Sequence, residues 1–504
     1  MINQIIDDAR ANGPSSYYAF EAFVLNLLKH HIELQGKIFE ATSDERFALA
    51  DGLAREGFDD FIGITAIEVK LSISRQSWRS ILERTHRYLA TTPNPAAIKN
   101  LVVVCGRAIP TGVKKLLLAE AAAENFPFNI FIWGVDDLNK IANKHKAKAN
   151  EISKNLFSLR LASAAEKTAI DWREERDRIK SQLKDCYQKG QFTLFLGAGV
   201  SSSAGMPDWN TLLNSLFVTY LTKEFNDDKS ASDEAISQLV GRLGAVDEPS
   251  ALMAARYLRK GLTKSSKEAE DFNAEITRNL YKLRNKSFDL DSRLIKSIVE
   301  MCMPRRTGAK VKSVITYNFD DLLERQLEKN RILCRCIYSD TETYDPDELP
   351  VYHVHGFLPE DRKKYDRLDK STLVFSEEGY HRIYSDSYHW SNLVQLNSLR
   401  ENNCLMVGLS MADPNLRRLL DLSAKNIERS KHYAFMKRLT RENFCFERKD
   451  GMSEPVVNDL PLADKFLDGH HTLNEQLMKE LGVSVIWYEN YDEIPQFIEE
   501  VVRQ

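Results

Sequence analysis

The first 157 residues alternate between helix-spaced and strand-like apolar positions. Phe20, Phe23, Val24, Leu27 and Leu28 recur every three or four residues, which is the spacing of one buried helix face. Strand-like runs and helical patterns follow it along the chain, at residues 37–41, 57–62, 64–71, 75–89, 101–105, 111–125, 128–133 and 135–144. This order predicts a compact α/β domain that ends near Phe157.

A second domain is predicted at residues 171–504, after a small, charged and weakly patterned linker at 158–170. It begins with a helix over 171–189 and a strand at Phe192, and a helical insert covers about 211–302. Strands and helices then alternate at 313–317, 320–329, 373–375, 377–383, 392–401, 405–409, 415–427, 433–436, 483–487 and 494–502. Such alternation predicts a parallel sheet with helices on both faces.

The composition places the chain among soluble globular proteins. Its 504 residues are 43% hydrophobic and 28% charged, with a formal net charge of −4, so any contact with DNA depends on a local basic patch. Seven scattered cysteines are typical of a reducing compartment and not of a disulfide framework. The first residues lack a signal-peptide pattern and no apolar run reaches a membrane span, so we expect a cytoplasmic protein.

A glycine-rich turn within the sequence FTLFLGAGVSSSAGMPDW (192–209) is the first candidate for binding chemistry. An apolar strand ends in Gly197-Ala198-Gly199 and gives way to a helical pattern. Such a turn lets backbone N–H groups approach a phosphate at a helix N-terminus. Ser202 occupies the position of the third glycine of the dinucleotide fingerprint, so a tight strand–helix connection without a ligand is the alternative.

Further motifs follow this turn in a fixed order. Residues 316–320 read Thr-Tyr-Asn-Phe-Asp, residues 352–356 read Tyr-His-Val-His-Gly, and 407–410 read Val-Gly-Leu-Ser, with Asp-Pro-Asn at 413–415. The series resembles the sirtuin family, in particular its bacterial sirtuin-like branch, over about residues 171–504.

This resemblance implies NAD⁺ as the ligand and assigns roles to individual residues. Asn318 would position the ribose hydroxyls and water, Asp320 would support that loop and the nicotinamide end, and His355 would act as the base. The phosphate and ribose contacts would come from Gly197, Ala198, Gly199, Ser201, Asp208, Gly408, Ser410 and Asp413. The pair Trp209-Asn210 departs from the Phe-Arg that usually follows Asp208 in the family.

Alternatives remain open for these residues. Asn318 could be a turn residue and His355 a loop histidine whose hydrogen bonds are satisfied, and His353 is a rival for the base. The sequence also lacks the two C-x-x-C pairs of the zinc module in deacetylating sirtuins, because Cys334 and Cys336 form only a C-x-C pair. The resemblance therefore implies water as the acceptor, and a product pair of ADP-ribose and nicotinamide.

The N-terminal domain carries a second set of candidate residues. Asp59 follows a strand-like run, and Glu68 and Lys70 share one face of the next strand. Two carboxylates can hold Mg²⁺, which activates water, while a lysine stabilises developing charge. With Glu21 on the first helix, the region resembles the Mrr-like branch of restriction-endonuclease-fold nucleases over about residues 14–150. Glu21, Asp59 and Glu68 would be the metal ligands, with Asp60 as a substitute for Asp59.

The two resemblances together imply an NAD⁺ hydrolase fused to a DNA nuclease, of the kind that depletes NAD⁺ in bacterial antiviral defence. Two other interpretations remain: a C-terminal domain that senses NAD⁺ or ADP-ribose and regulates the nuclease, or a degenerate nuclease that only binds DNA or mediates assembly. The basic helix over residues 75–87 could follow a phosphate backbone or simply be solvated. The resemblance also implies a homo-oligomer, and a partner defence protein is a further option.

Overall fold

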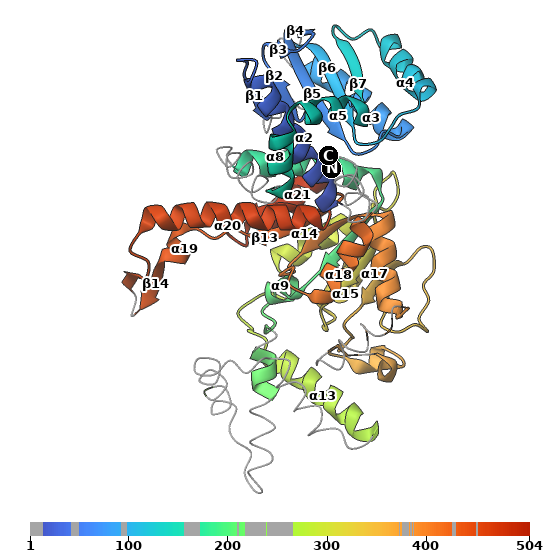
Figure 1. Cartoon of the computed structure of the whole chain (residues 1–504). Coiled ribbons are helices and arrows are strands. Elements are labelled where there is room, and N and C mark those ends of the chain that lie inside the picture. The colour runs from blue at the N-terminus through green and yellow to red at the C-terminus, as the bar shows by residue number, and fades with distance from the viewer. Residues whose placement is uncertain are drawn as a thin grey trace. The chain divides into compact units, whose positions relative to one another are not determined.

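The computed structural model of the chain contains two compact units (Figure 1). The first comprises residues 1–171, 424–430 and 457–482, and the second comprises residues 172–423, 431–456 and 483–504. The residues that the structure describes are 14–41, 50–91, 98–155, 172–208, 211–216, 238, 266–371, 373–374, 383, 386, 388–425, 430–449 and 452–503. The predicted linker at 158–170 and much of the predicted helical insert lie outside these ranges.

A five-stranded sheet forms the centre of the first unit's described part, in the order β1-β2-β5-β6-β7. The first two strands pair antiparallel and the last three pair parallel. Their bounds are β1 Phe39–Ala41, β2 Gly52–Ala54, β5 Ile64–Lys70, β6 Ile98–Cys105 and β7 Asn129–Trp133. The α/β class expected for this region is therefore present, with a mixed sheet.

Helices cover both faces of this sheet, and alternate residues of each strand face the two layers. Ile67 and Val69 pack in one cluster with α2 (Pro14–Glu33), α5 (Val135–Lys144) and α6 (Lys146–Lys154). Ala66 packs in the other cluster with α3 (Arg75–Thr91) and α4 (Thr111–Ala123). The apolar stripe predicted for the first helix lies on the buried face of α2. Because Glu68 and Lys70 alternate with Ile67 and Val69, they lie on the α3 face.

The strand expected at residues 57–62 is interrupted. It forms two short strands, β3 (Gly57–Phe58) and β4 (Phe61–Ile62), which pair antiparallel as a hairpin. Asp59 lies in the turn between them with φ of 45°, a left-handed conformation that ends an extended run. Asp59 therefore lies at the tip of a hairpin and not at the end of a strand in the main sheet.

The second unit is built on a seven-stranded sheet of described strands, in the order β10-β11-β9-β8-β12-β13-β16. All neighbouring strands pair parallel. Their bounds are β8 Phe192–Leu196, β9 Val311–Thr316, β10 Cys334–Ile337, β11 Leu349–His353, β12 Asn403–Val407, β13 His432–Lys437 and β16 Val483–Tyr488. The parallel sheet predicted from the alternating pattern is confirmed.

The connections give this sheet the doubly wound topology of dinucleotide-binding folds. The chain leaves β8 toward β9 and β11 on one side, then crosses to β12, β13 and β16 on the other. One hydrophobic core joins the sheet to α8 (Trp172–Lys189), α14 (Arg293–Cys302), α15 (Leu322–Lys329) and α21 (Glu493–Val502). Other described α-helices of the unit are α9 (Ala198–Ser202), α13 (Ser266–Lys282), α17 (Trp390–Glu401), α18 (Pro414–Ala424) and α19 (Arg441–Cys445).

Sequence patterns missed several short or polar elements. β10 and the antiparallel hairpin of β14 (Phe446–Lys449) and β15 (Met452–Pro455) were not predicted, and neither was α20 (Leu460–Glu480). Leu373 and Val374, expected in a strand, lie outside any strand. No described helix combines the length and apolar character that crossing a bilayer requires.

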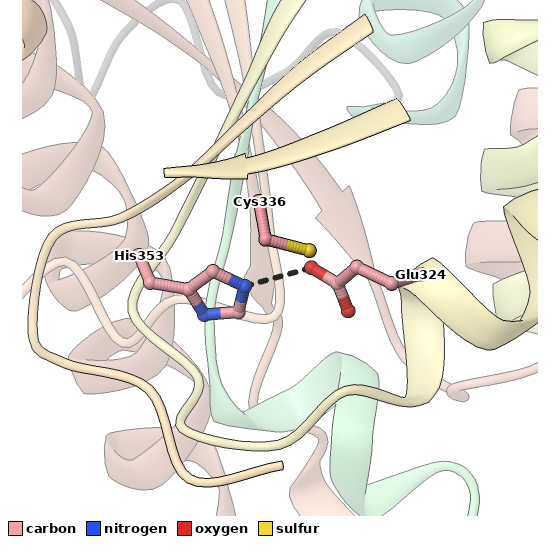
Figure 2. Close-up of side chains that lie close together, drawn as sticks. All are labelled: Glu324, Cys336 and His353. Carbon is pink, nitrogen blue, oxygen red and sulfur yellow. Dashed lines mark hydrogen bonds and ion pairs between the residues drawn. The ribbon is translucent and has the colours of Figure 1, made fainter. Parts of the chain in front are cut away.

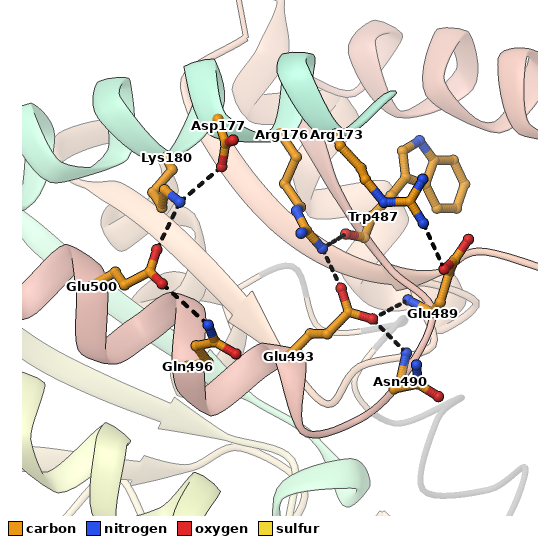
Figure 3. Close-up of polar contacts among 10 residues, drawn as sticks. All are labelled: Arg173, Arg176, Asp177, Lys180, Trp487, Glu489, Asn490, Glu493, Gln496 and Glu500. Carbon is orange, nitrogen blue, oxygen red and sulfur yellow. Dashed lines mark hydrogen bonds and ion pairs between the residues drawn. The ribbon is translucent and has the colours of Figure 1, made fainter. Parts of the chain in front are cut away.

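Charged side chains join the first and last helices of the second unit (Figure 3). Arg173 contacts Glu489 at 3.0 Å, and Lys180 contacts Glu500 at 2.7 Å. Arg176 pairs with Glu493, whose other oxygen accepts hydrogen bonds from the backbone N–H groups of residues 489 and 490. The network therefore holds α8 against α21, although more than 300 residues separate them in the sequence.

Candidate functional site

The candidate site lies at the carboxyl ends of the parallel strands of the second unit. β8 and β12 are neighbours at the point where the chain direction across the sheet reverses. Gly197 follows β8 directly and Gly408 follows β12. In open α/β sheets, ligands bind outside the carboxyl ends of the strands at such a reversal point. The glycine turn predicted from the sequence is therefore placed where a dinucleotide would be expected.

The glycines of this turn have a packing reason that the sequence did not reveal. The Gly197 N–H donates to the Val407 carbonyl and the Gly199 N–H to the Gly408 carbonyl, each at 2.9 Å. A Cβ at Gly197 would lie 2.5 Å from the Leu409 side chain, and a Cβ at Gly199 would lie 2.8 Å from the Gly408 Cα. Glycine is thus required for the close approach of the two loops, whatever ligand lies above them.

A small pocket beside this turn brings together three of the predicted residues. Ser201, Asn318 and Asp320 line it, together with Leu196, Val200, Ile295, Thr316, Leu322, Leu323 and Glu324. Ser201 comes from α9, whereas Asn318 and Asp320 follow β9. All three side chains are buried, so polar groups from separate parts of the chain meet in an environment with little water. Of the other lining residues, sequence reasoning assigned no role to Thr316 or Glu324.

Asp320 is a buried carboxyl group with two hydrogen-bond donors. Its side chain accepts hydrogen bonds from the Ser201 hydroxyl and, at 3.2 Å, from the Leu322 N–H. The pKa of Asp320 is raised from 3.8 to about 6, mainly by burial; the two hydrogen bonds oppose this rise, and the charges of Glu324 and Asp321 add to it. Asp320 therefore titrates close to neutral pH and connects α9 to the Asn318 loop.

His355 lies next to this pocket but is not among the residues that line it. Its ring packs against Tyr317 with a centroid distance of 4.5 Å, and its Nε2 lies 4.0 Å from an Asp413 carboxylate oxygen. Burial lowers the pKa of His355, and the nearby Asp413 charge offsets this only in part. The imidazole is therefore neutral at pH 7, which is the form a general base requires.

His353, the rival histidine, has a different environment. Its side chain is fully buried, its Nδ1 lies 3.1 Å from the Asn318 carbonyl oxygen, and its Nε2 lies 2.7 Å from Glu324 Oε1. Both ring nitrogens are therefore engaged within the protein. His353 is therefore poorly placed to act as the base.

The remaining predicted contact residues take part in local backbone capping. Asp413 Oδ1 accepts the Leu416 N–H at 2.7 Å, and Asp208 Oδ1 accepts the Thr211 N–H at 2.7 Å, so both cap a following helical segment. Ser410 Oγ accepts the Ala412 N–H at 3.3 Å. These bonds give each residue a structural role in addition to the ligand contact implied by the resemblance. Residues 209 and 210 lie outside the described part of the chain.

The structure does not bring together the three metal ligands expected in the first unit. Asp59 is held at the hairpin tip by His31 Nε2 at 2.8 Å and by Gln35 Nε2 at 2.9 Å. Glu68 instead pairs with Lys70 and with Arg84, the latter at 2.6 Å. Among the described residues, Glu21, Asp59 and Glu68 do not form a cluster of three ligand atoms within 4.8 Å of one another.

Asp51 is a carboxylate near Glu68 to which sequence reasoning assigned no role. Gly52 of β2 pairs with Ile67 of β5, so Asp51 stands opposite Glu68 in the same register. The Asp51 N–H donates to the Ile67 carbonyl at 2.8 Å, and its Oδ2 accepts the Val69 N–H at 2.7 Å. The only signal in the sequence was the Asp-Gly pair at the start of a short strand. That this strand pairs with the Glu-x-Lys strand is visible only in the fold.

Comparison with known proteins identifies a SIR2-like segment in the second unit. Residues 312–450 match the family model of the SIR2-like domain. The matched segment contains Asn318, Asp320, His355, Gly408 and Asp413, but not the glycine turn after β8. The SIR2-like character predicted for this part of the chain is confirmed.

The chain is also similar to a curated enzyme. It is 23% identical over 339 residues to the NAD(+) hydrolase ThsA of Enterococcus faecium, an alignment that covers 64% of this chain. The chain spans 57% of the length of that relative. Neither comparison matches the chain to a nuclease, so the nuclease activity of the first unit stays a prediction.

Proposed function

We propose that the second unit binds NAD⁺ and hydrolyses the bond between nicotinamide and ribose, with ADP-ribose and nicotinamide as products. The observation that carries the proposal is the meeting of Ser201, Asn318 and Asp320 in one pocket beside the reversal point of the sheet. The similarity to an NAD(+) hydrolase supports the same reaction. Gly197, Ala198 and Gly199 would hold the phosphates, and Asp208, Gly408, Ser410 and Asp413 would complete the ribose and adenine contacts.

The chemistry suits the groups that are present. Nicotinamide leaves as a neutral ring from a pyridinium, so departure needs no acid, while the sugar passes through an oxocarbenium-like state. Asn318 would orient the ribose hydroxyls and the incoming water. Asp320 would support the loop that carries Asn318 through its hydrogen bonds. Neutral His355 would accept the proton of the nucleophile, since its pKa is lowered by burial.

Nicotinamide release from purified protein tests the proposal. We expect release with the wild-type chain and a loss of about 100-fold or more in Asn318→Ala and His355→Ala, since both remove a group that contacts the reacting centre. Asn397→Ala is the matched control, because Asn397 is an exposed asparagine of the same unit. Wild-type turnover in either site variant would remove that residue's assignment.

Binding without cleavage would favour the alternative of a sensor. If calorimetry detected NAD⁺ or ADP-ribose binding that Asn318→Ala weakened, yet no nicotinamide appeared, the unit would report the nucleotide to the rest of the chain. A role in antiviral defence, a homo-oligomeric state and a partner defence protein extend the proposal. Cellular NAD⁺ levels after phage infection and light scattering of the purified chain test these extensions.

A metal-dependent DNA nuclease is the second candidate function, now centred on Asp51 instead of Asp59. Asp51 faces Glu68 across β2 and β5, and Lys70 contacts Glu68 directly. Two carboxylates and a lysine are groups that suit Mg²⁺, which would activate water and polarise the phosphodiester. The carboxylate of Glu68 is only 1% exposed and already paired with Lys70 and Arg84, so a cation would have to rearrange these contacts.

Plasmid nicking in the presence of Mg²⁺ separates an active nuclease from a degenerate one. We expect nicking that disappears in Asp51→Ala and Glu68→Ala but persists in Asp59→Ala. Glu83→Ala is the control, because Glu83 is exposed on α3 of the same unit. A wild-type chain that does not nick but shifts DNA in a gel would instead support a DNA-binding or assembly role.

A further inference from the structure

Three side chains from separate elements meet in a cluster beside the candidate pocket, in which Glu324 and His353 are buried and Cys336 is half-buried (Figure 2). Glu324 comes from α15, Cys336 from β10 and His353 from β11. Their potential ligand atoms all lie within 4.8 Å of one another. Glu324 also lines the pocket that Asn318 and Asp320 line. The cluster therefore adjoins the candidate site, although the proposed reaction gives it no role.

His353 connects this cluster to the backbone of Asn318. The Asn318 carbonyl can only accept a hydrogen bond, so His353 Nδ1, at 3.1 Å, carries the proton that it donates. His353 Nε2 lies 2.7 Å from Glu324 Oε1, and Figure 2 shows the Glu324 carboxylate pointing at the imidazole ring. One proton therefore lies between Nε2 and Glu324 Oε1, and this bond fixes the orientation of the imidazole.

The peptide units on both sides of Asn318 are held by this arrangement. Its N–H donates to the Thr316 hydroxyl at 3.1 Å, while its carbonyl accepts from His353. Thr316 is itself tied to the β11 end, because its carbonyl accepts the Val354 N–H at 3.1 Å. With both backbone groups engaged, the direction of the Asn318 side chain depends on the position of His353.

A metal ion is the competing explanation for the cluster. Glutamate, cysteine and histidine can all bind zinc. However, both ring nitrogens of His353 already have partners, so a metal would have to displace the Glu324 bond. Burial and the charge of Glu324 also raise the pKa of Cys336, which favours the thiol over the thiolate that binds metals.

We propose that Glu324 and His353 are positioning residues that hold the Asn318 backbone so that its amide is aimed at the ribose. This inference rests on the proposed function, in which Asn318 contacts the substrate. We call Glu324 and His353 together the clamp. Fully buried polar side chains cost free energy unless their hydrogen bonds are made, so the bonds of the clamp hold its two side chains in place. Misplacing a reacting contact by about 1 Å can cost about 100-fold in rate.

Two pairs of near-isosteric substitutions test the clamp. Glu324→Gln keeps it, because the new amide can donate to His353 Nε2 while Nδ1 still donates to Asn318, whereas Glu324→Met removes it. His353→Asn keeps a donor for the Asn318 carbonyl, whereas His353→Leu does not. We expect kcat for nicotinamide release to fall about 10- to 100-fold in the Met and Leu variants, with KM for NAD⁺ changed less than about 3-fold. The Gln and Asn variants should stay within about 5-fold of wild type.

The outcomes separate this inference from the proposed function. If wild type releases nicotinamide and folded Met and Leu variants match its kcat, the clamp is refuted and the function stands. A purely structural role would lower the melting temperature of each variant without the difference in kcat between the paired substitutions, which also refutes it. If wild type releases none, crystal structures of the variants decide: an unmoved Asn318 peptide in Glu324→Met refutes the clamp, and a rotated one supports it.

A metal assay addresses the competing explanation. Elemental analysis of the purified chain should show no stoichiometric transition metal, before or after incubation with zinc and desalting. One bound zinc per chain that Glu324→Met and Cys336→Ser both remove would overturn the clamp in favour of a metal centre.

Discussion

At the scale of single residues, the candidate site depends on two ionisable groups with opposite responses to burial. Burial favours the neutral form of each, so it raises the pKa of Asp320 to about 6 and lowers that of His355. The two groups lie on neighbouring loops, after β9 and β11. Asp320 is thus charged at neutral pH at a cost in stability, whereas His355 is kept uncharged.

Removing the charge of Asp320 should therefore stabilise the chain while it impairs the reaction. Asp320→Asn retains an oxygen that can accept the Leu322 N–H but carries no buried charge. Because the folded pKa lies above the ordinary 3.8, the wild-type chain loses stability as pH rises from about 4 to 6, by up to about 3 kcal/mol. Denaturant unfolding of both proteins between pH 4 and 8 should show that the difference between their free energies of unfolding grows as pH rises through this range. A difference that does not change with pH would contradict the burial argument.

At the scale of elements, the reversal point of the sheet depends on contact between two glycine loops. Gly408 adopts φ of 68°, and a Cβ there would lie 2.6 Å from the Val200 backbone nitrogen. Because backbone atoms on both sides are tied into β8 and β12, neither loop can move away without breaking strand hydrogen bonds. The turn after β8 is thus held by the loop after β12 and not by its own sequence alone.

Alanine at Gly408 should be strongly destabilising. Both a left-handed backbone and a backbone clash oppose the added Cβ, so we expect a loss of about 2 kcal/mol or more, together with weaker NAD⁺ binding. Gly469→Ala is the control, since nothing lies within 4 Å of a Cβ at this helical position and alanine there should stabilise by about 0.5–1 kcal/mol. Thermal denaturation measures both, and equal melting temperatures would refute the packing argument.

At the scale of the whole molecule, the second unit is closed by elements from its two ends. α8 opens the unit and α21 closes it, and both contribute to one core through buried residues such as Ile179, Leu183, Phe497 and Ile498. Ion pairs lie around the same contact, and the hydrogen bond from Lys180 lowers the pKa of Glu500. Partly exposed pairs contribute little, whereas buried side chains contribute several kcal/mol each.

The stability of the contact between α8 and α21 should thus depend on the buried apolar side chains more than on the ion pairs. Ile498→Ala, at a fully buried position, should lower the free energy of unfolding by about 2–5 kcal/mol. Glu500→Gln should lower it by less than about 1 kcal/mol, and this smaller effect should fade in high salt. Denaturant unfolding in low and high salt measures both, and a larger loss from the charge substitution would reverse the ranking.

What the sequence by itself determined is local: the helices and strands with clear periodicity, the parallel sheet implied by their alternation, and the order of the SIR2-like motifs. These follow from the side chains of one segment, because burial of one face repeats every two or every three to four residues. The interrupted strand at Asp59 and the short strand β10 escaped this reasoning, since two to four residues carry too little periodicity.

Only the tertiary structure decided which distant residues meet. Strand register placed Asp51, and not Asp59, opposite Glu68, and loop packing explained Gly197 and Gly199 by their contact with Gly408. It also separated the two histidines, since His353 holds Glu324 and the Asn318 carbonyl while His355 lies beside Tyr317 and Asp413. The physical reason is that register, burial and pKa depend on neighbours tens to hundreds of residues away, which no local pattern encodes.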